Sequence, residues 1–180
     1  MLAILAAAAA RADVTESVSY RSYDVRPSGG QTLAAAVNAA TPIHEDGRSM
    51  AGHTTWHVWW HFTWHRATDG SCAIDTVHCD VTAEITLPQL ESGDQATRER
   101  FQTFLAALEV HERGHVRIAE AAARDVEDAI RALPAAPDCA SLDREANEAG
   151  QRVLARSRSD EVRYDQDTQH GRTQGAWLRQ

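Results

Sequence analysis

Polar and apolar residues alternate along two stretches of the chain, which an Asp69-Gly70 turn separates. In residues 53–65, the apolar face carries Trp56, Val58, Trp60, Phe62 and Trp64. In residues 72–87, the expected inward face carries Ala73, Val77, Cys79, Val81, Ala83, Ile85 and Leu87. A period of two is typical of strands that bury one face, and Asp-Gly favours a tight turn. The two stretches therefore predict an antiparallel hairpin.

The other face of the first of these strands carries a row of histidines, His57, His61 and His65. Four residues along a strand span about 13 Å, which is too far for two side chains to share one metal ion. We therefore interpret the row as a half-exposed polar face of the sheet, with the lining of a substrate cleft as the alternative.

The segments that precede the hairpin predict one more strand and a short helix. Residues 14–25 alternate like a strand. Residues 31–40 are rich in alanine and predict a helix that stops before Pro42. Residues 43–52 are loop-like, because they contain turn residues and no regular apolar period.

Beyond the hairpin, apolar residues recur with helical spacing. The N-cap residue Asp94 begins a long helix, and its apolar stripe continues to Leu133. A further helix begins at Asp138 or Ser141 and runs to about residue 155. These elements predict an α+β fold in which a small antiparallel sheet packs against the long helix.

Three polar residues interrupt the apolar stripe of the long helix, namely His111, Glu112 and His115. Residues four apart lie on one face of a helix, so both imidazoles can face one metal ion. This is the H-E-x-x-H pattern of zinc hydrolases, in which two histidines bind Zn²⁺ and the glutamate is the general base. Burying polar groups in a core-facing stripe is costly unless something compensates, and a metal ion would do so.

Gly114 lies within the same motif. A glycine inside a helix costs about 0.5–1 kcal/mol relative to alanine. It either allows another segment to approach the helix closely, or is simply tolerated. It is also a candidate position for a break in a helix of this length.

Composition and charge limit the class of partner. Asp and Glu number 26 and the basic residues number 18, all of them arginine, which gives a net charge of −8. Because no basic stripe is present, nucleic acid and anionic membranes are disfavoured as partners. The length of 180 residues predicts a single domain, residues 13–180, after a short leader.

Residues 1–12 are interpreted as a signal peptide, because a short apolar run is followed by Ala10-Arg11-Ala12, a small-x-small cleavage site. The run is too short to span a bilayer, and no other stretch is apolar enough to do so. We therefore expect a periplasmic or secreted protein that begins at Asp13. In such oxidising compartments disulfides persist.

Three cysteines allow three single disulfides. Cys72 and Cys79 lie on one predicted strand, about 23 Å apart, whereas a disulfide needs Cα atoms within about 7 Å. We therefore favour a bond between Cys72 and Cys139 over this local competitor.

The order of these features resembles a bacterial family of predicted secreted zinc-dependent proteases, also described as a domain of unknown function. The resemblance rests on the Trp-rich strand, the Cys72 strand that ends in Thr86-Leu87-Pro88, and the His111-Glu112 helix. It continues in Cys139 and in a closing motif, Tyr164-Asp165-x-x-Thr168-x-His170-Gly171. The resemblance implies a zincin-like metallohydrolase with peptidase activity. Cys79 is an extra thiol relative to the family pattern.

Catalytic zinc needs a third protein ligand, and His170 is our preferred candidate. It lies in a turn-rich segment that could deliver a side chain, it matches the other imidazoles, and the resemblance points to the same motif. Carboxylates of the following helix, Asp143, Glu145 or Glu148, are the alternative. Asp165 would then accept a hydrogen bond from a ligand histidine, or be the ligand itself.

The expected function is hydrolysis of peptide bonds by Glu112-activated water on Zn²⁺, with Tyr164 donating a hydrogen bond to the oxyanion. The substrate would be a peptide or a protein. One alternative is a non-enzymatic envelope protein that zinc stabilises, which would have a closed site with four ligands. Another is an amidase that acts on cell-wall peptides.

Overall fold

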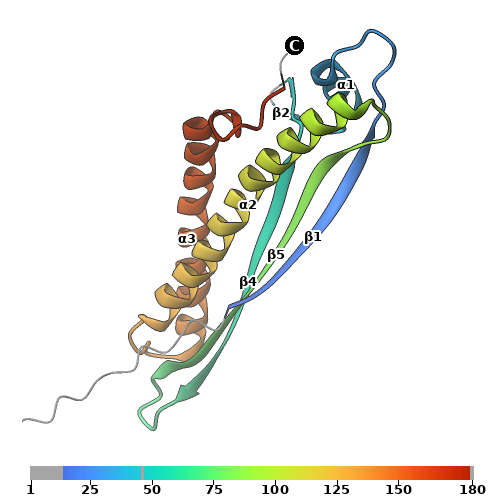
Figure 1. Ribbon diagram of the computed structural model, residues 1–180. Helices are drawn as coiled ribbons and strands as arrows, with labels where there is room; N and C mark the ends of the chain where they lie inside the picture. The colour runs from blue at the N-terminus through green and yellow to red at the C-terminus, as the bar shows by residue number, and fades with distance from the viewer. Residues whose placement is uncertain (1–13, 46, 179–180) are drawn as a thin grey trace, which may run out of the picture.

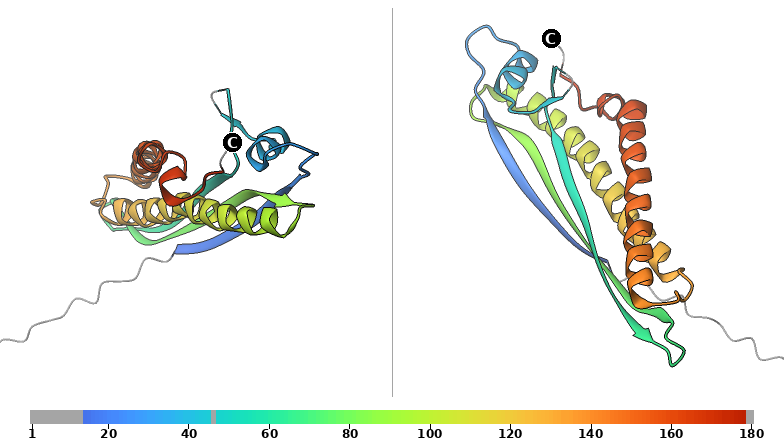
Figure 2. Two further views of the ribbon diagram at one scale, coloured as in Figure 1. Left: turned by 45° about the horizontal axis from the view of Figure 1, so that its top comes forward. Right: turned by 180° about the vertical axis from the view of Figure 1, so that it is seen from behind.

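The computed structural model describes residues 14–45 and 47–178, which form an α+β fold (Figure 1). The main sheet contains three strands, β1 (Val14–Val25), β4 (His53–Arg66) and β5 (Cys72–Leu90), in the order β1-β5-β4. Two long helices, α2 (Gln95–Arg131) and α3 (Cys139–Thr168), lie on one side of this sheet (Figure 2). Smaller elements gather near one end of α2: α1 (Leu33–Ala40), β2 (His44–Glu45), β3 (Arg48–Ser49) and the 3₁₀ helix η1 (Arg172–Gln174).

The predicted hairpin is confirmed, but the prediction of a purely antiparallel sheet was wrong. Strands β4 and β5 pair antiparallel, whereas β1 pairs with β5 in parallel, with Val14 opposite Cys79. Parallel neighbours need a long crossover between them, and here α1, the β2–β3 pair and β4 all lie between β1 and β5 in the chain. The sheet is therefore mixed.

A register shift between β4 and β5 changes which residues of β5 face inward. The predicted inward face was wrong at one residue, Ala73. Thr63 lies opposite Thr76 and Trp64 lies opposite Ile74, so Asp75 is an extra residue in β5. A bulge of this kind reverses the alternation of side chains beyond it. Cys72 and Ile74 consequently pack inward, and Ala73 does not. The remaining six predicted residues are buried.

The histidine row on β4 is exposed, as predicted. His57, His61 and His65 are all solvent-accessible, and Trp59 beside them is 63% exposed. This face of the sheet is the one that neither long helix covers.

Helix α2 begins where the sequence predicted. The Asp94 side chain accepts a hydrogen bond from the backbone N–H of Thr97, and the helix continues without a break through Gly114. Its buried face joins two hydrophobic clusters. One packs Val126 and Ile130 against β5 and α3, and the other packs Phe101 and Phe104 against β1, β5 and α1. The polar trio of α2 lies between the two clusters.

Helix α3 is longer than the sequence predicted. Asp138 caps it, but the helix continues to Thr168 rather than ending near residue 155. The Ser157 side chain is buried and donates its hydroxyl to the Val153 carbonyl, so the serines in this region do not end the helix. Tyr164 and Asp165 therefore lie on a helix that runs beside α2, and not in a turn-rich segment (Figure 1).

The predicted disulfide between Cys72 and Cys139 is present, with 5.0 Å between the two Cα atoms. It ties β5 to the start of α3, and Cys72 also exchanges two backbone hydrogen bonds with Ala136. Cys79 is free and buried, and burial raises the pKa of its thiol to about 12. The predicted signal peptide, residues 1–12, and Asp13 lie outside the described residues. Within 14–45 and 47–178, no helix has the length and apolar character to cross a membrane.

Candidate metal centre

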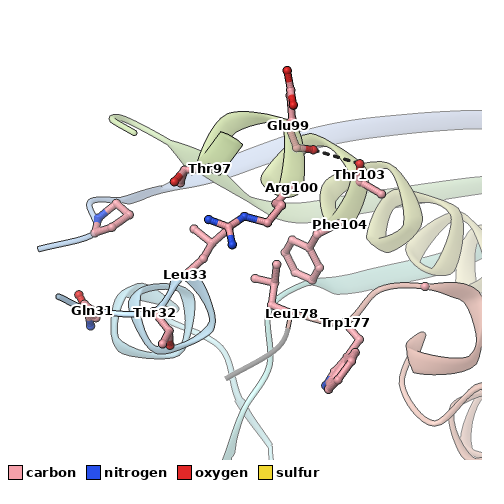
Figure 3. A pocket seen from close by; sticks show the side chains of 12 residues that line it. Gln31, Thr32, Leu33, Thr97, Glu99, Arg100, Thr103, Phe104, Trp177 and Leu178 are labelled. Atoms are coloured by element: carbon pink, nitrogen blue, oxygen red, sulfur yellow. Dashed lines mark hydrogen bonds between the residues drawn. The ribbon is translucent and has the colours of Figure 1, made fainter. Parts of the chain in front are cut away.

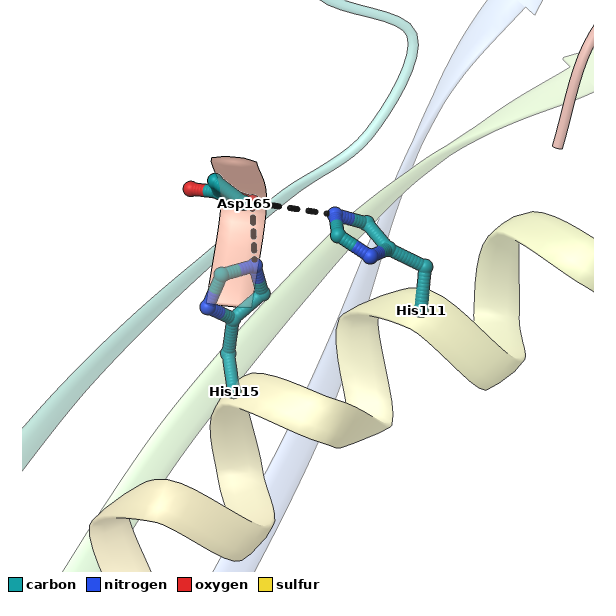
Figure 4. A group of neighbouring side chains, drawn as sticks. All are labelled: His111, His115 and Asp165. Atoms are coloured by element: carbon teal, nitrogen blue, oxygen red, sulfur yellow. Dashed lines mark ion pairs between the residues drawn. The ribbon is translucent and has the colours of Figure 1, made fainter. Parts of the chain in front are cut away.

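The two histidines of the motif lie one turn apart on α2 and face the same way. His111 is 3% exposed and His115 is 7% exposed, and their rings lie 5.0 Å apart in an edge-to-face arrangement. Figure 4 shows both rings extending from α2 toward α3. The helical period therefore brings two imidazole nitrogens to one point, as the sequence predicted.

Asp165 of α3 meets both rings at that point. Its Oδ1 atom lies 3.2 Å from Nε2 of His111 and 3.2 Å from Nε2 of His115 (Figure 4). These three are the one group of potential metal ligands, among the described residues, whose ligand atoms all lie within 4.8 Å of one another. Ligand atoms about 2.0–2.1 Å from a tetrahedral zinc ion lie about 3.3 Å apart. The spacing therefore fits a zinc ion.

The second nitrogen of each ring also has a partner. Nδ1 of His115 lies 2.9 Å from Oε2 of Glu161, and Nδ1 of His111 lies 3.0 Å from Oε1 of Gln174. When Nδ1 carries the proton and donates it to such an oxygen, the Nε2 lone pair is free for a metal. Neither partner was expected from the sequence. Glu161 lies one turn before Asp165, so a helix predicted through this region would have identified it.

Glu112 lies beside the histidines but is not among the three potential ligands. It is 3% exposed, and the Thr54 hydroxyl donates to its Oε2 atom over 2.7 Å. Gly52 makes room for the carboxylate, since a Cβ at that position would lie 2.6 Å from Oε1. Burial raises the pKa of Glu112, while the Thr54 hydrogen bond and the nearby histidines act in the opposite direction.

A cleft of about 100 Å³ connects these groups to the surface. It is lined by side chains of the motif, by Asp165 and Glu161 from α3, and by residues 50–54 at the start of β4. The cleft is therefore the place where a small reacting group could contact both the three converging ligand atoms and the Glu112 carboxylate.

Tyr164 packs against the ring of His111. Its hydroxyl donates to the His111 backbone carbonyl over 3.0 Å, and its ring stacks on the His111 ring at 5.1 Å. It does not line the cleft. The structure thus places the Tyr164 hydroxyl on the backbone of α2 and outside the cleft, whereas the sequence suggested that it donates a hydrogen bond to the oxyanion.

Gly114 allows this close packing of α3 on α2. A Cβ at Gly114 would overlap the hydroxyl and ring of Tyr164. Of the two interpretations that the sequence left open, the structure therefore supports the close approach of another segment.

We expect Gly114→Ala to lower the free energy of unfolding by about 1–3 kcal/mol, because the half-buried Tyr164 ring would have to shift. In an unobstructed helix the same change would stabilise by about 0.5–1 kcal/mol. Chemical denaturation measures the difference. Gly29→Ala is the matched control, since a Cβ there meets nothing within 4 Å. A Gly114→Ala variant as stable as the parent would contradict the prediction.

His170 lies at the rim of the cleft rather than in the group of three. Its Nδ1 atom is 3.7 Å from Oδ1 of Asp165, its side chain is 42% exposed, and its backbone is left-handed with φ of 52°. Glu148, on the outer surface of α3, is exposed and pairs with Arg152 at 3.7 Å, so it does not join the group either. The geometry therefore favours Asp165 as the third ligand, although the sequence favoured His170.

Residues 20–171 match a family described as "Bacterial protein of unknown function (DUF922)". The chain belongs to this family. The matched region contains the three converging residues together with Glu112, Glu161 and Tyr164. Comparisons with curated proteins and with solved structures found no significant match.

In the metal-free form of the chain, the carboxylates around His115 favour the protonated, positively charged form of its imidazole. Burial alone would lower the pKa of His115, but hydrogen bonds to Asp165 and Glu161, and their charges, raise it to about 10. Burial would raise the pKa of Asp165, but hydrogen bonds from His111 and His115 hold it well below its usual range. A proton occupies His115 in this form, and a metal cation could replace it.

Proposed function

We propose that this protein is a zinc-dependent hydrolase that cleaves peptide bonds, with Glu112 as the general base. The observation that carries the proposal is the convergence of three ligand atoms, from His111, His115 and Asp165, in the cleft that the buried Glu112 also lines. Two histidines and one carboxylate are a ligand set of catalytic zinc sites in peptidases.

The ligand set fits catalysis better than a structural role. Structural zinc sites are closed by four protein ligands, whereas catalytic sites keep one position open. The convergent group contains three members among the described residues, and it lies in a cleft that reaches the surface. A zinc ion held here would supply a Lewis acid and would make water more acidic. This argues against the envelope protein that zinc only stabilises.

Glu112 supplies the proton transfer that hydrolysis requires. Its carboxylate takes a proton from the attacking water and passes it to the leaving amine. Thr54 fixes one carboxylate oxygen, so the other is the atom that can hold the proton. Burial raises the pKa of Glu112, which makes the carboxylate a stronger base.

Glu112 also distinguishes hydrolysis from a different chemistry. Two histidines and one carboxylate are likewise the ligands of non-haem iron oxygenases, which need open positions for oxygen. A buried carboxylate in the same cleft is what hydrolysis needs and what oxygen binding does not. An amidase that acts on cell-wall peptides would use the same groups, because the bond cleaved is again an amide.

The disulfide between Cys72 and Cys139 bears on where the protein acts. Disulfides are typical of oxidising compartments. Together with the expected signal peptide, this bond leads us to propose that the protein acts in the periplasm or outside the cell on peptides or proteins.

The test combines metal analysis with a hydrolysis assay on the purified chain. We expect about one zinc per chain, and cleavage of a mixture of unstructured peptides, detected by mass spectrometry. A chelator should abolish cleavage and added zinc should restore it. Zinc binding without cleavage of peptides or cell-wall amides would contradict the enzyme, and iron in place of zinc would favour the oxygenase chemistry.

Zinc binding to the metal-free protein should release a proton near neutral pH. With a pKa of about 10, His115 is protonated in the metal-free form, whereas zinc takes neutral imidazole. The apparent zinc affinity should therefore rise about tenfold per pH unit between about pH 7 and pH 9, and level off above about pH 10. Calorimetry in buffers of different ionisation enthalpy counts the protons. A heat of zinc binding that is the same in all buffers would mean that no proton is released, and would contradict the prediction.

A further inference from the structure

A second hollow, much larger than the metal-site cleft, lies at the N-terminal end of α2. This groove has a volume of about 590 Å³ and is bounded by the first turns of α2, the start of α1 and residues 175–178 (Figure 3). Its apolar wall consists of Leu33, Phe104, Trp177 and Leu178. Pockets of this size and lining are typical of sites that bind organic ligands.

One cation faces into the groove. Arg100 extends from α2 toward Leu33 on α1 (Figure 3), and its Nε atom donates to the Ala96 carbonyl over 3.3 Å. Within residues 14–45 and 47–178, its guanidinium forms no ion pair with a carboxylate. Glu99, the other charged residue of the lining, accepts a hydrogen bond from the Gln95 amide over 2.7 Å. The groove therefore combines a large apolar wall with a guanidinium that has no ion-pair partner within 4 Å among the described residues.

A third hollow, of about 300 Å³, lies between the groove and the metal-site cleft and shares lining residues with both. It shares Phe104 and Trp177 with the groove, and it shares Met50 and His170 with the cleft. The three hollows therefore follow one another from the N-terminal end of α2 to the metal-site cleft.

The length of this row of hollows suits an extended peptide. Arg100 lies eleven residues before His111 on α2, which corresponds to about 16 Å along the helix axis. About five residues of extended peptide cover the same distance. A peptide cleaved at the metal site could therefore reach Arg100 with a residue about five positions away.

We propose that the groove is the outer part of the substrate site. It takes a peptide that carries a large apolar side chain and a carboxylate about five residues from the cleaved bond. The carboxylate binds Arg100 and the apolar side chain packs against Phe104 and Trp177. Either an acidic side chain or the end of the peptide chain can supply the carboxylate, since a guanidinium binds both in the same way. This inference rests on the proposed function, which makes the ligand a substrate.

The test is a binding measurement that needs no turnover. Fluorescence anisotropy follows the binding of labelled peptides to the zinc-loaded chain. One pair of peptides differs by Glu or Gln at one position, and a second pair differs by a free or an amidated C-terminus. Arg100→Glu should weaken binding of the carboxylate peptides about tenfold or more and leave the amide peptides unchanged. Trp177→Ala, at a half-exposed position, should weaken binding of all peptides with a large apolar side chain.

Arg98→Glu is the matched control, because it makes the same charge change two residues away. Arg98 donates to the Gly93 carbonyl and lines a different hollow. Equal losses in the Arg98 and Arg100 variants, or no loss in either, would overturn the inference. Arg100-dependent binding without any hydrolysis would support the groove and reject the proposed enzyme. Hydrolysis that is unchanged by Arg100→Glu would support the proposed enzyme and reject the groove as part of its substrate site.

Discussion

Glu112→Gln is expected to lower kcat by about 10²- to 10⁴-fold while zinc stays bound, because a general base contributes about this much. The carboxylate lies in the cleft but outside the group of three potential ligands, so its loss should not release the metal. Gln keeps the shape of the side chain and can still accept the Thr54 hydrogen bond. Steady-state kinetics and zinc analysis on the same sample measure both quantities.

Glu109→Gln is the matched control for this substitution. Glu109 lies three residues earlier on α2, but its carboxylate accepts a hydrogen bond from Tyr20 and does not line the cleft. The control should keep full activity. An active, zinc-loaded Glu112→Gln variant would assign the base to another residue, and a variant that loses zinc would make Glu112 a structural partner of the metal.

Asp165→Ala should lower zinc affinity by more than about a hundredfold. Removing a partner of a ligand already costs about ten- to a hundredfold, and here a ligand itself would be lost. His170→Ala should keep about one zinc per chain, because His170 lies outside the convergent group. Zinc stoichiometry after dialysis, and titration with a competing chelator, separate the two variants.

Asp167→Ala provides the control for a lost carboxylate on the same helix. Asp167 is exposed and lies two residues beyond Asp165. It should bind zinc like the parent chain. If His170→Ala loses zinc and Asp165→Ala keeps it, then His170 is the third ligand, as the sequence alone suggested.

Helices and strands that are determined by residues close together in the chain could be predicted from the amino-acid sequence. Alternation with period two predicted β1, β4 and β5 at nearly their observed bounds, and a side-chain cap at Asp94 predicted the start of α2. Helical spacing also placed His111 and His115 on one face, since four residues make about one turn. The disulfide between Cys72 and Cys139 could be predicted because an extended strand separates Cys79 from Cys72.

Some local features could not be predicted from the sequence, because the pattern of polar and apolar residues does not show the contact that decides them. The bulge at Asp75 turns Ala73 away from the core, although the alternation on either side is regular. The helix expected to end near residue 155 continues to Thr168, although serine competes with helix formation. The Ser157 hydroxyl instead bonds to the Val153 carbonyl within α3.

The residues that complete the site depend on contacts between distant parts of the chain. Asp165 and Glu161 reach His111 and His115 because α3 runs back along α2, and that packing depends on a close fit of Tyr164 against Gly114. The parallel pairing of β1 with β5 is likewise a contact between distant segments. Periodicity reports which face of an element is buried, whereas the partner on that face is chosen by the packing of whole elements.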